Sequence, residues 1–114
     1  MKNHTLFVLL LISSAVMAQK VNQQKATMSL GPQNAYYVEI EGADKDLLED
    51  TWKEYVKEYG KVNHNKKAKE FVSEKVVVTL INGSTPLTLY AKFEEGNGLS
   101  TTYLWVDLGT GFSN

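Results

Sequence analysis

Asp107 and Lys92 are of the residue types that general acid–base catalysis uses. Sequence parity allows the two side chains to project from the same face of neighbouring strands, with Tyr103 or His64 available to assist. A small carboxylate-based hydrolase or lyase would need these groups to converge in a cleft. Because sequence order gives no evidence of their proximity, this reaction class is an alternative rather than the leading hypothesis.

Other catalytic and metal-binding arrangements find little support. The chain has no Cys, and His64 is its only His beyond position 4, whereas zinc sites need three or four N, S or O ligands. No Gly-x-Ser-x-Gly elbow is present. Glu94 and Glu95 are adjacent, so in a strand they point to opposite faces. We therefore expect a non-enzymatic protein without a cofactor or metal.

An aromatic face is the feature that stands out above this background. If the C-terminal segments are strands, four rings share one side of the sheet: Tyr37, Tyr90, Tyr103 and Trp105. Such a patch either binds something or is covered by something. Cover could come from the N-terminal segment through Met28 and Leu30, or from a second subunit, whereas a ligand could be a peptide, a glycan or another protein. These four residues are the candidate ligand- or partner-binding site.

The charge distribution argues against nucleic acid as the partner. Lys and Arg together number 12 against 13 acids, all 12 are Lys, and nucleic-acid binders generally need a cationic surface and use Arg on phosphate. The segment 61–69 holds four lysines and could attract an anionic polymer or a membrane surface. Protection of an edge strand by charge is the alternative explanation for these lysines.

The elements expected to position these residues follow from periodicity. Residues 35–41, 87–94 and 99–108 alternate apolar and polar side chains as half-buried strands do, and Gly96-Asn97-Gly98 indicates a tight hairpin between the last two. Residues 44–59 repeat apolar side chains at helical spacing, with Asp44 as the cap, an acidic first half and Gly60 as a left-handed stop. The segment 61–69 could be an edge strand or a loop, and 76–81 resembles a strand covered on both faces.

This order predicts an α+β fold in which a single helix packs on one face of a mainly antiparallel sheet of four to five strands (β-α-β-β-β). The helix is expected to cover the apolar members of the strands, namely Val38, Ile40, Leu89, Phe93, Leu104 and Val106. The aromatic face then lies on the opposite side of the sheet.

The first residues indicate export. Lys2, a short apolar run over 6–12 and the sequence Val16-Met17-Ala18 are typical of a signal peptide cleaved after Ala18, and the run is too short for a membrane span. Gln19 rather than Cys follows the cut, so no lipid anchor is expected. We expect a signal peptide over 1–18, a partly flexible tail over 19–34, and one domain over 35–114 in the periplasm or outside the cell.

The helix and the last hairpin carry a resemblance. The stretches 49–55 and 59–61, with 89–95 and the strand Trp105-Val106-Asp107-Leu108-Gly109, resemble small exported bacterial proteins of unknown function, whose chains continue past this strand. A more distant similarity is to TATA-binding-protein-like folds. The resemblance implies a fold and a bacterial envelope setting, and its motifs are structural.

The leading hypothesis from the sequence is therefore an exported, non-enzymatic binding or assembly domain that uses its aromatic sheet face. Its partner would be a protein, a peptide, a glycan or a second copy of the chain. A further alternative is an inhibitor or chaperone-like module that offers an edge strand to its partner.

Overall fold

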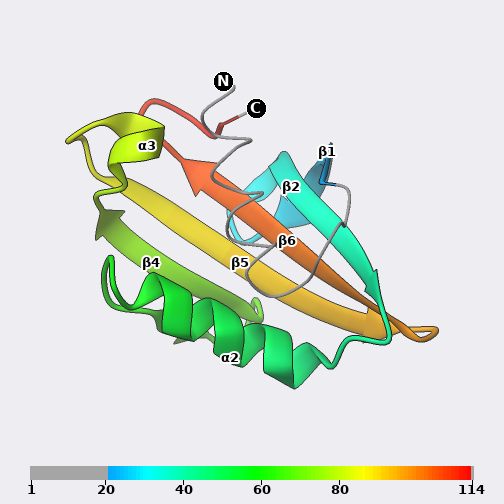
Figure 1. The fold of residues 1–114 in the computed structure, drawn as a ribbon. Coiled ribbons are helices and arrows are strands. Elements are labelled where there is room, and N and C mark those ends of the chain that lie inside the picture. Colours follow the sequence, from blue (N-terminus) through cyan, green and yellow to red (C-terminus); the bar gives the residue numbers. More distant parts are fainter. Residues whose placement is uncertain (1–20, 114) are drawn as a thin grey trace.

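The computed structural model describes residues 21–113, so the expected signal peptide lies outside the described residues. The fold is α+β, with one antiparallel sheet of six strands and two short helices (Figure 1). The strands lie in the order β1-β2-β6-β5-β4-β3. Their bounds are β1 Asn22–Met28, β2 Gly31–Glu41, β3 Asn63–Asn65, β4 Glu70–Val76, β5 Leu87–Gly96 and β6 Leu99–Asp107.

The helix α2 (Lys45–Val56) packs along one face of this sheet. Asp44 caps it, since its side chain accepts a hydrogen bond from the Asp46 amide at 2.9 Å. The helix ends at Val56, three residues earlier than predicted, and Gly60 does not have the expected left-handed backbone. A Cβ on residue 60 would lie 3.3 Å from Val76 Cγ2, so glycine here allows close packing on β4.

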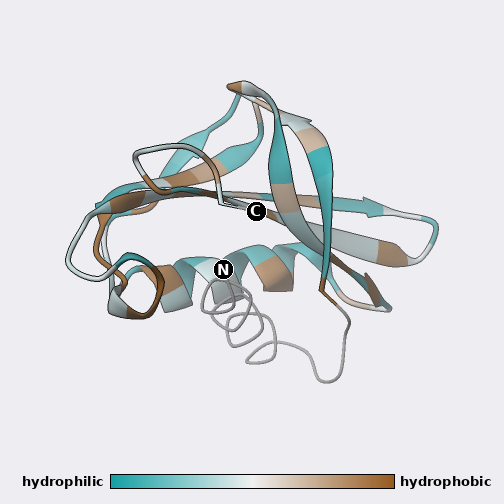
Figure 2. Ribbon diagram, turned by 90° about the horizontal axis from the view of Figure 1, so that it is seen from above, coloured by the Kyte–Doolittle hydropathy of each residue, from teal (hydrophilic) through white to brown (hydrophobic). Residues whose placement is uncertain are grey.

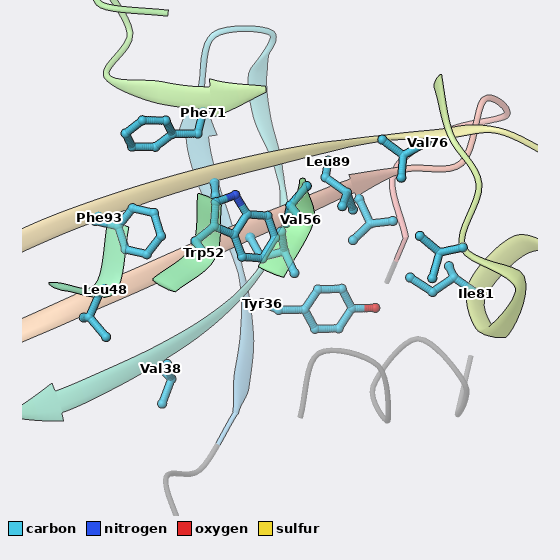
Figure 3. Close-up of a cluster of buried hydrophobic side chains, with 14 of the residues drawn as sticks. Tyr36, Val38, Leu48, Trp52, Val56, Phe71, Val76, Ile81, Leu89 and Phe93 are labelled. Atoms are coloured by element: carbon cyan, nitrogen blue, oxygen red, sulfur yellow. The ribbon is translucent and has the colours of Figure 1, made fainter. Parts of the chain in front are cut away.

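The main core lies between α2 and the sheet. Leu48, Trp52 and Val56 from the helix meet the strand residues that the sequence assigned to this side (Figure 3). All six predicted members are buried in the same cluster, which confirms the parity assignment: Val38, Ile40, Leu89, Phe93, Leu104 and Val106. None of the helices within residues 21–113 is long and apolar enough to cross a membrane.

The last hairpin also agrees with the sequence. β5 and β6 pair in continuous register from Thr88↔Asp107 to Gly96↔Leu99. Asn97 and Gly98 at the turn have φ values of 54° and 75°, as a primed two-residue turn requires.

The segment expected as a tail over 19–34 instead contributes a hairpin. β1 pairs with β2 from Asn22↔Tyr37 to Met28↔Gly31. Apolar residues are few in β1 because it is an edge strand that turns most of its side chains to solvent, so periodicity gives no strand signal there. Figure 2 shows this hairpin leaving the sheet on the side away from α2.

The prediction of a strand over 76–81 was wrong. β4 comes earlier and carries a register shift between Ser73 and Val76, with Lys75 at a φ of 56°. Such a bulge breaks the two-residue alternation on which recognition of a strand depends. The apolar run that follows holds the short helix α3 (Thr79–Asn82), in which Ile81 is buried and Leu80 is exposed. The lysine-rich 61–69 segment forms the short edge strand β3 and the turn after it.

Candidate functional site

The face of the sheet away from α2 holds a second, smaller apolar cluster. Met28, Ala35 and Trp105 are its buried members, and Tyr90, Tyr103 and Phe112 pack against them while remaining half-buried. This separation from the main core places Trp105 and Trp52 on opposite sides of the sheet, as the sequence predicted.

Trp105 is covered from within the chain. Its side chain is only 1% exposed, and its indole Nε1 donates a hydrogen bond to the Gln33 carbonyl at 3.3 Å. Both Gln33 and Met28 belong to the β1–β2 hairpin, which lies over β6 at this point. Met28 therefore contributes the cover that the sequence suggested, whereas Leu30 is 56% exposed and does not.

The tip of the hairpin is hydrogen-bonded to β4, which lies beyond β6 and β5 in the sheet. Glu70 in β4 is fully buried, and its carboxylate accepts hydrogen bonds from the Ser29 amide at 2.8 Å and the Ser29 hydroxyl at 2.7 Å. Because β6 and β5 lie between β2 and β4 in the sheet, the hairpin must fold across both of them to make this contact. The sheet and the hairpin thus enclose the small cluster.

The rings of the aromatic face stack on one another rather than forming an open platform. Tyr103 stacks on Tyr37 with ring centroids 5.9 Å apart and on Trp105 at 5.8 Å. Tyr90 lies opposite Trp105 in the strand register and packs against Phe112 at 5.9 Å. Tyr103 therefore offers its edge and hydroxyl to a ligand rather than an uncovered ring face.

The hydroxyls of Tyr103 and Tyr90 stay protonated near neutral pH. Burial raises the pKa of Tyr103, and the carboxylates of Glu94 and Glu39 raise it further. Burial likewise raises the pKa of Tyr90, with Asp107 as the next cause. Both hydroxyls can therefore donate hydrogen bonds to a ligand.

Two hollows adjoin this cluster. The rim hollow, about 420 Å³, lies between the hairpin tip and the β3–β4 turn and is lined by Thr27, Met28, Ser29, Lys67, Ala68, Lys69, Glu70 and Lys92. The wall hollow, about 150 Å³, is lined by Ala26, Thr27, Lys92, Glu94, Tyr103 and Trp105. Thr27 and Lys92 line both, so the two hollows are neighbours, and together they are called the groove and form the candidate site.

A neighbouring hollow shares Lys69 and Lys92 with the rim hollow. A third hollow of about 540 Å³ is lined by Lys45, Lys69, Lys92, Phe93, Glu94 and Glu95. Lys92 lines all three hollows and pairs with Glu94 at 3.5 Å. From the sequence, Lys92 is a candidate only for catalysis. Its position in all three hollows arises because the hairpin folds across the sheet.

The candidate catalytic pair is not brought together. Lys92 lies opposite Tyr103, whereas Asp107 lies opposite Thr88, four positions further along β6. At the usual rise of an extended chain this spacing separates them by roughly 13 Å. Asp107 instead accepts a hydrogen bond from the Gly109 amide at 2.9 Å, and His64 stacks on Phe71 at 4.5 Å.

Metal ligands do not gather in the part of the chain that the structure describes: no group of three or more His, Asp or Glu side chains there could hold an ion. No family model, curated protein or solved structure matches this chain. The resemblance to small exported bacterial proteins therefore stays a prediction, and the function must be argued from the groove itself.

Proposed function

We propose that this chain is an exported binding domain that holds its ligand in the groove between the β1–β2 hairpin and the back of the sheet. The observation that carries the proposal is that two neighbouring hollows beside the hairpin share Thr27 and Lys92 in their linings. Binding sites for small ligands are typically concave. Here the lining that a ligand would meet is mostly polar in the wall hollow, with Tyr103 as its accessible ring, and lysines line the rim hollow.

The aromatic residues take different parts in this proposal. Trp105 supports the wall from beneath, because almost none of its surface is exposed. Tyr103 can contact the ligand with its ring edge and its hydroxyl. Tyr37 extends the stack beyond the hollow, and Tyr90 holds the neighbouring position against Phe112.

The fluorescence of Trp105 provides a direct test. The Trp52→Phe variant leaves Trp105 as the only tryptophan, and it can be titrated with a panel of acidic and neutral oligosaccharides and peptides. We expect at least one member of the panel to shift the emission of Trp105 with saturation. No shift with any member would contradict the proposal.

A blocking variant locates the effect. Ala26→Phe places a ring in the wall hollow, because Ala26 packs toward Trp105 and lines this hollow, and it should abolish the shift. Thr110→Phe introduces the same ring in an exposed turn that lines neither hollow, and it should leave the shift intact. A shift that survives Ala26→Phe would place the ligand outside the wall hollow.

A further inference from the structure

The rim hollow collects positive charge in a chain whose formal net charge is −1. Lys67 and Lys69 reach it from the β3–β4 turn, and Lys92 reaches it from β5. Among residues 21–113, neither Lys67 nor Lys69 forms an ion pair. Two of the three ammonium groups are therefore free to meet an external charge.

Glu70 is the one carboxylate in the lining of the rim hollow. One of its oxygens accepts a hydrogen bond from the Ser29 amide and the other accepts one from the Ser29 hydroxyl. Glu70 is thereby committed to the hairpin tip rather than to the lysines. The lining thus has three lysines, of which only Lys92 is ion-paired, against one carboxylate that is already hydrogen-bonded.

The backbone conformation at Lys69 is unusual for a lysine. Its φ of 58° lies in the left-handed region, which glycine and asparagine adopt more easily than lysine. Lys69 lines both the rim hollow and the third hollow. A long cationic side chain therefore occupies a turn position whose backbone disfavours it, at the mouth of the groove.

We propose that the rim hollow binds an oxyanion, meaning a carboxylate, sulfate or phosphate group. This inference rests on the proposed binding function and names the chemistry of the ligand. Lysine ammonium groups make charge-assisted hydrogen bonds to such anions, and three lysines line the rim hollow. The anionic group can belong to a free small ion or to an acidic unit of a polymer, whose next part would enter the wall hollow.

Calorimetric titration of the purified protein tests the inference. The probes are inorganic phosphate, inorganic sulfate, an oligogalacturonate and an uncharged oligosaccharide of the same length. We expect saturable binding of at least one anionic probe, weakened by added salt because the attraction is electrostatic. Much tighter binding of the oligogalacturonate would identify a polymer-borne acid as the source, and equal binding would identify a free ion.

Paired lysine variants locate the anion. Lys67→Gln combined with Lys69→Asn removes two charges from the rim and should weaken anion binding at least tenfold, since asparagine tolerates the left-handed backbone. Lys25→Gln combined with Lys61→Gln removes the same charge from exposed positions outside these hollows and should leave the affinity within about twofold. Circular dichroism of both variants checks that they remain folded.

The outcomes separate this inference from the proposed function. Failure of every anionic probe, or equal binding by the rim variant and the native protein, would overturn the oxyanion site. A neutral probe that shifts Trp105 emission in that case would leave the binding function standing. Lysine-dependent anion binding with no probe affecting Trp105 would support the rim site and remove the wall hollow from the proposed function.

Discussion

Glu70, at the start of β4, accepts hydrogen bonds from both the amide and the hydroxyl of Ser29, which lies 41 positions earlier at the tip of the first hairpin. This contact joins two segments that are separated by β6 and β5 in the sheet. It holds the hairpin over Trp105 and thereby forms one side of the groove. The candidate site therefore depends on this contact together with the Trp105–Gln33 hydrogen bond and the packing of Met28.

Removal of the Ser29 hydroxyl should loosen this contact. We expect Ser29→Ala to lower the free energy of unfolding by about 1–2 kcal/mol, because a hydrogen bond to a buried carboxylate is lost while the amide bond remains. Trp105 in the Trp52→Phe background should become more accessible to acrylamide. The matched control is Ser84→Ala, in an exposed turn, which should change neither quantity.

A double-mutant cycle with Glu70→Gln measures the contact itself. The amide side chain keeps one acceptor but presents a donor to Ser29, so Glu70→Gln should cost about 1–3 kcal/mol. The effects of the two changes should not add, with a coupling of roughly 0.5 kcal/mol or more in urea unfolding. Strict additivity would show that Ser29 and Glu70 contribute independently.

Trp105 and Tyr103 should differ in their effect on stability. Trp105→Ala removes a fully buried ring and should cost about 3–5 kcal/mol. Tyr103→Ala removes a half-buried ring and should cost about half as much, while weakening ligand binding more strongly than its stability effect explains. Equal unfolding midpoints for the native protein and Trp105→Ala would contradict the covered position of the indole.

Substitution of Ser73, unlike the changes above, should stabilise the protein. Its hydroxyl is buried and has no hydrogen-bond partner within residues 21–113. Because an unsatisfied buried hydroxyl opposes folding, Ser73→Ala should raise the free energy of unfolding by roughly 1 kcal/mol. Thermal unfolding provides the measurement, and a clear loss of stability would mean that the hydroxyl has a partner in solution.

Alkaline pH should weaken the fold through Tyr55. Burial and a hydrogen bond with Tyr59 raise its pKa from 10.0 to about 12. Since the folded pKa lies above the unfolded value, this contribution to stability is complete below pH 10 and is lost as the pH rises toward 12. Urea unfolding at pH 9 and pH 11 should show this fall, with a smaller fall in Tyr55→Phe. Equal falls in both proteins would contradict the assignment to Tyr55.

The parts of the fold that the sequence predicted are those with uninterrupted periodicity. β5, β6 and α2 alternate or repeat apolar residues cleanly, and both tryptophans lie on their expected sides of the sheet. β4 was missed because its bulge interrupts alternation, and β1 was missed because an exposed edge strand needs few apolar residues.

The groove could not be predicted from local pattern. Its lining comes from the hairpin tip, the β3–β4 turn and the middle of β5, which meet only because the hairpin folds across the sheet. The one available signal was indirect. Met28 is one of the residues that the sequence predicts as cover for the aromatic face, and it packs against Trp105. The buried Glu70 gave no sequence signal, since a glutamate is expected at the surface unless a partner, here the distant Ser29, is known.

Chemical-shift mapping of the backbone amides tests the central claim most directly. A ligand from the fluorescence panel is titrated into isotope-labelled protein, and shifts are followed at every assigned residue. The groove predicts the largest changes at Thr27, Ser29, Lys69 and Lys92, which come from three separate segments. Changes confined to the outer edge of β1 or β3, with these four amides unmoved, would contradict the groove and favour recognition through an edge strand.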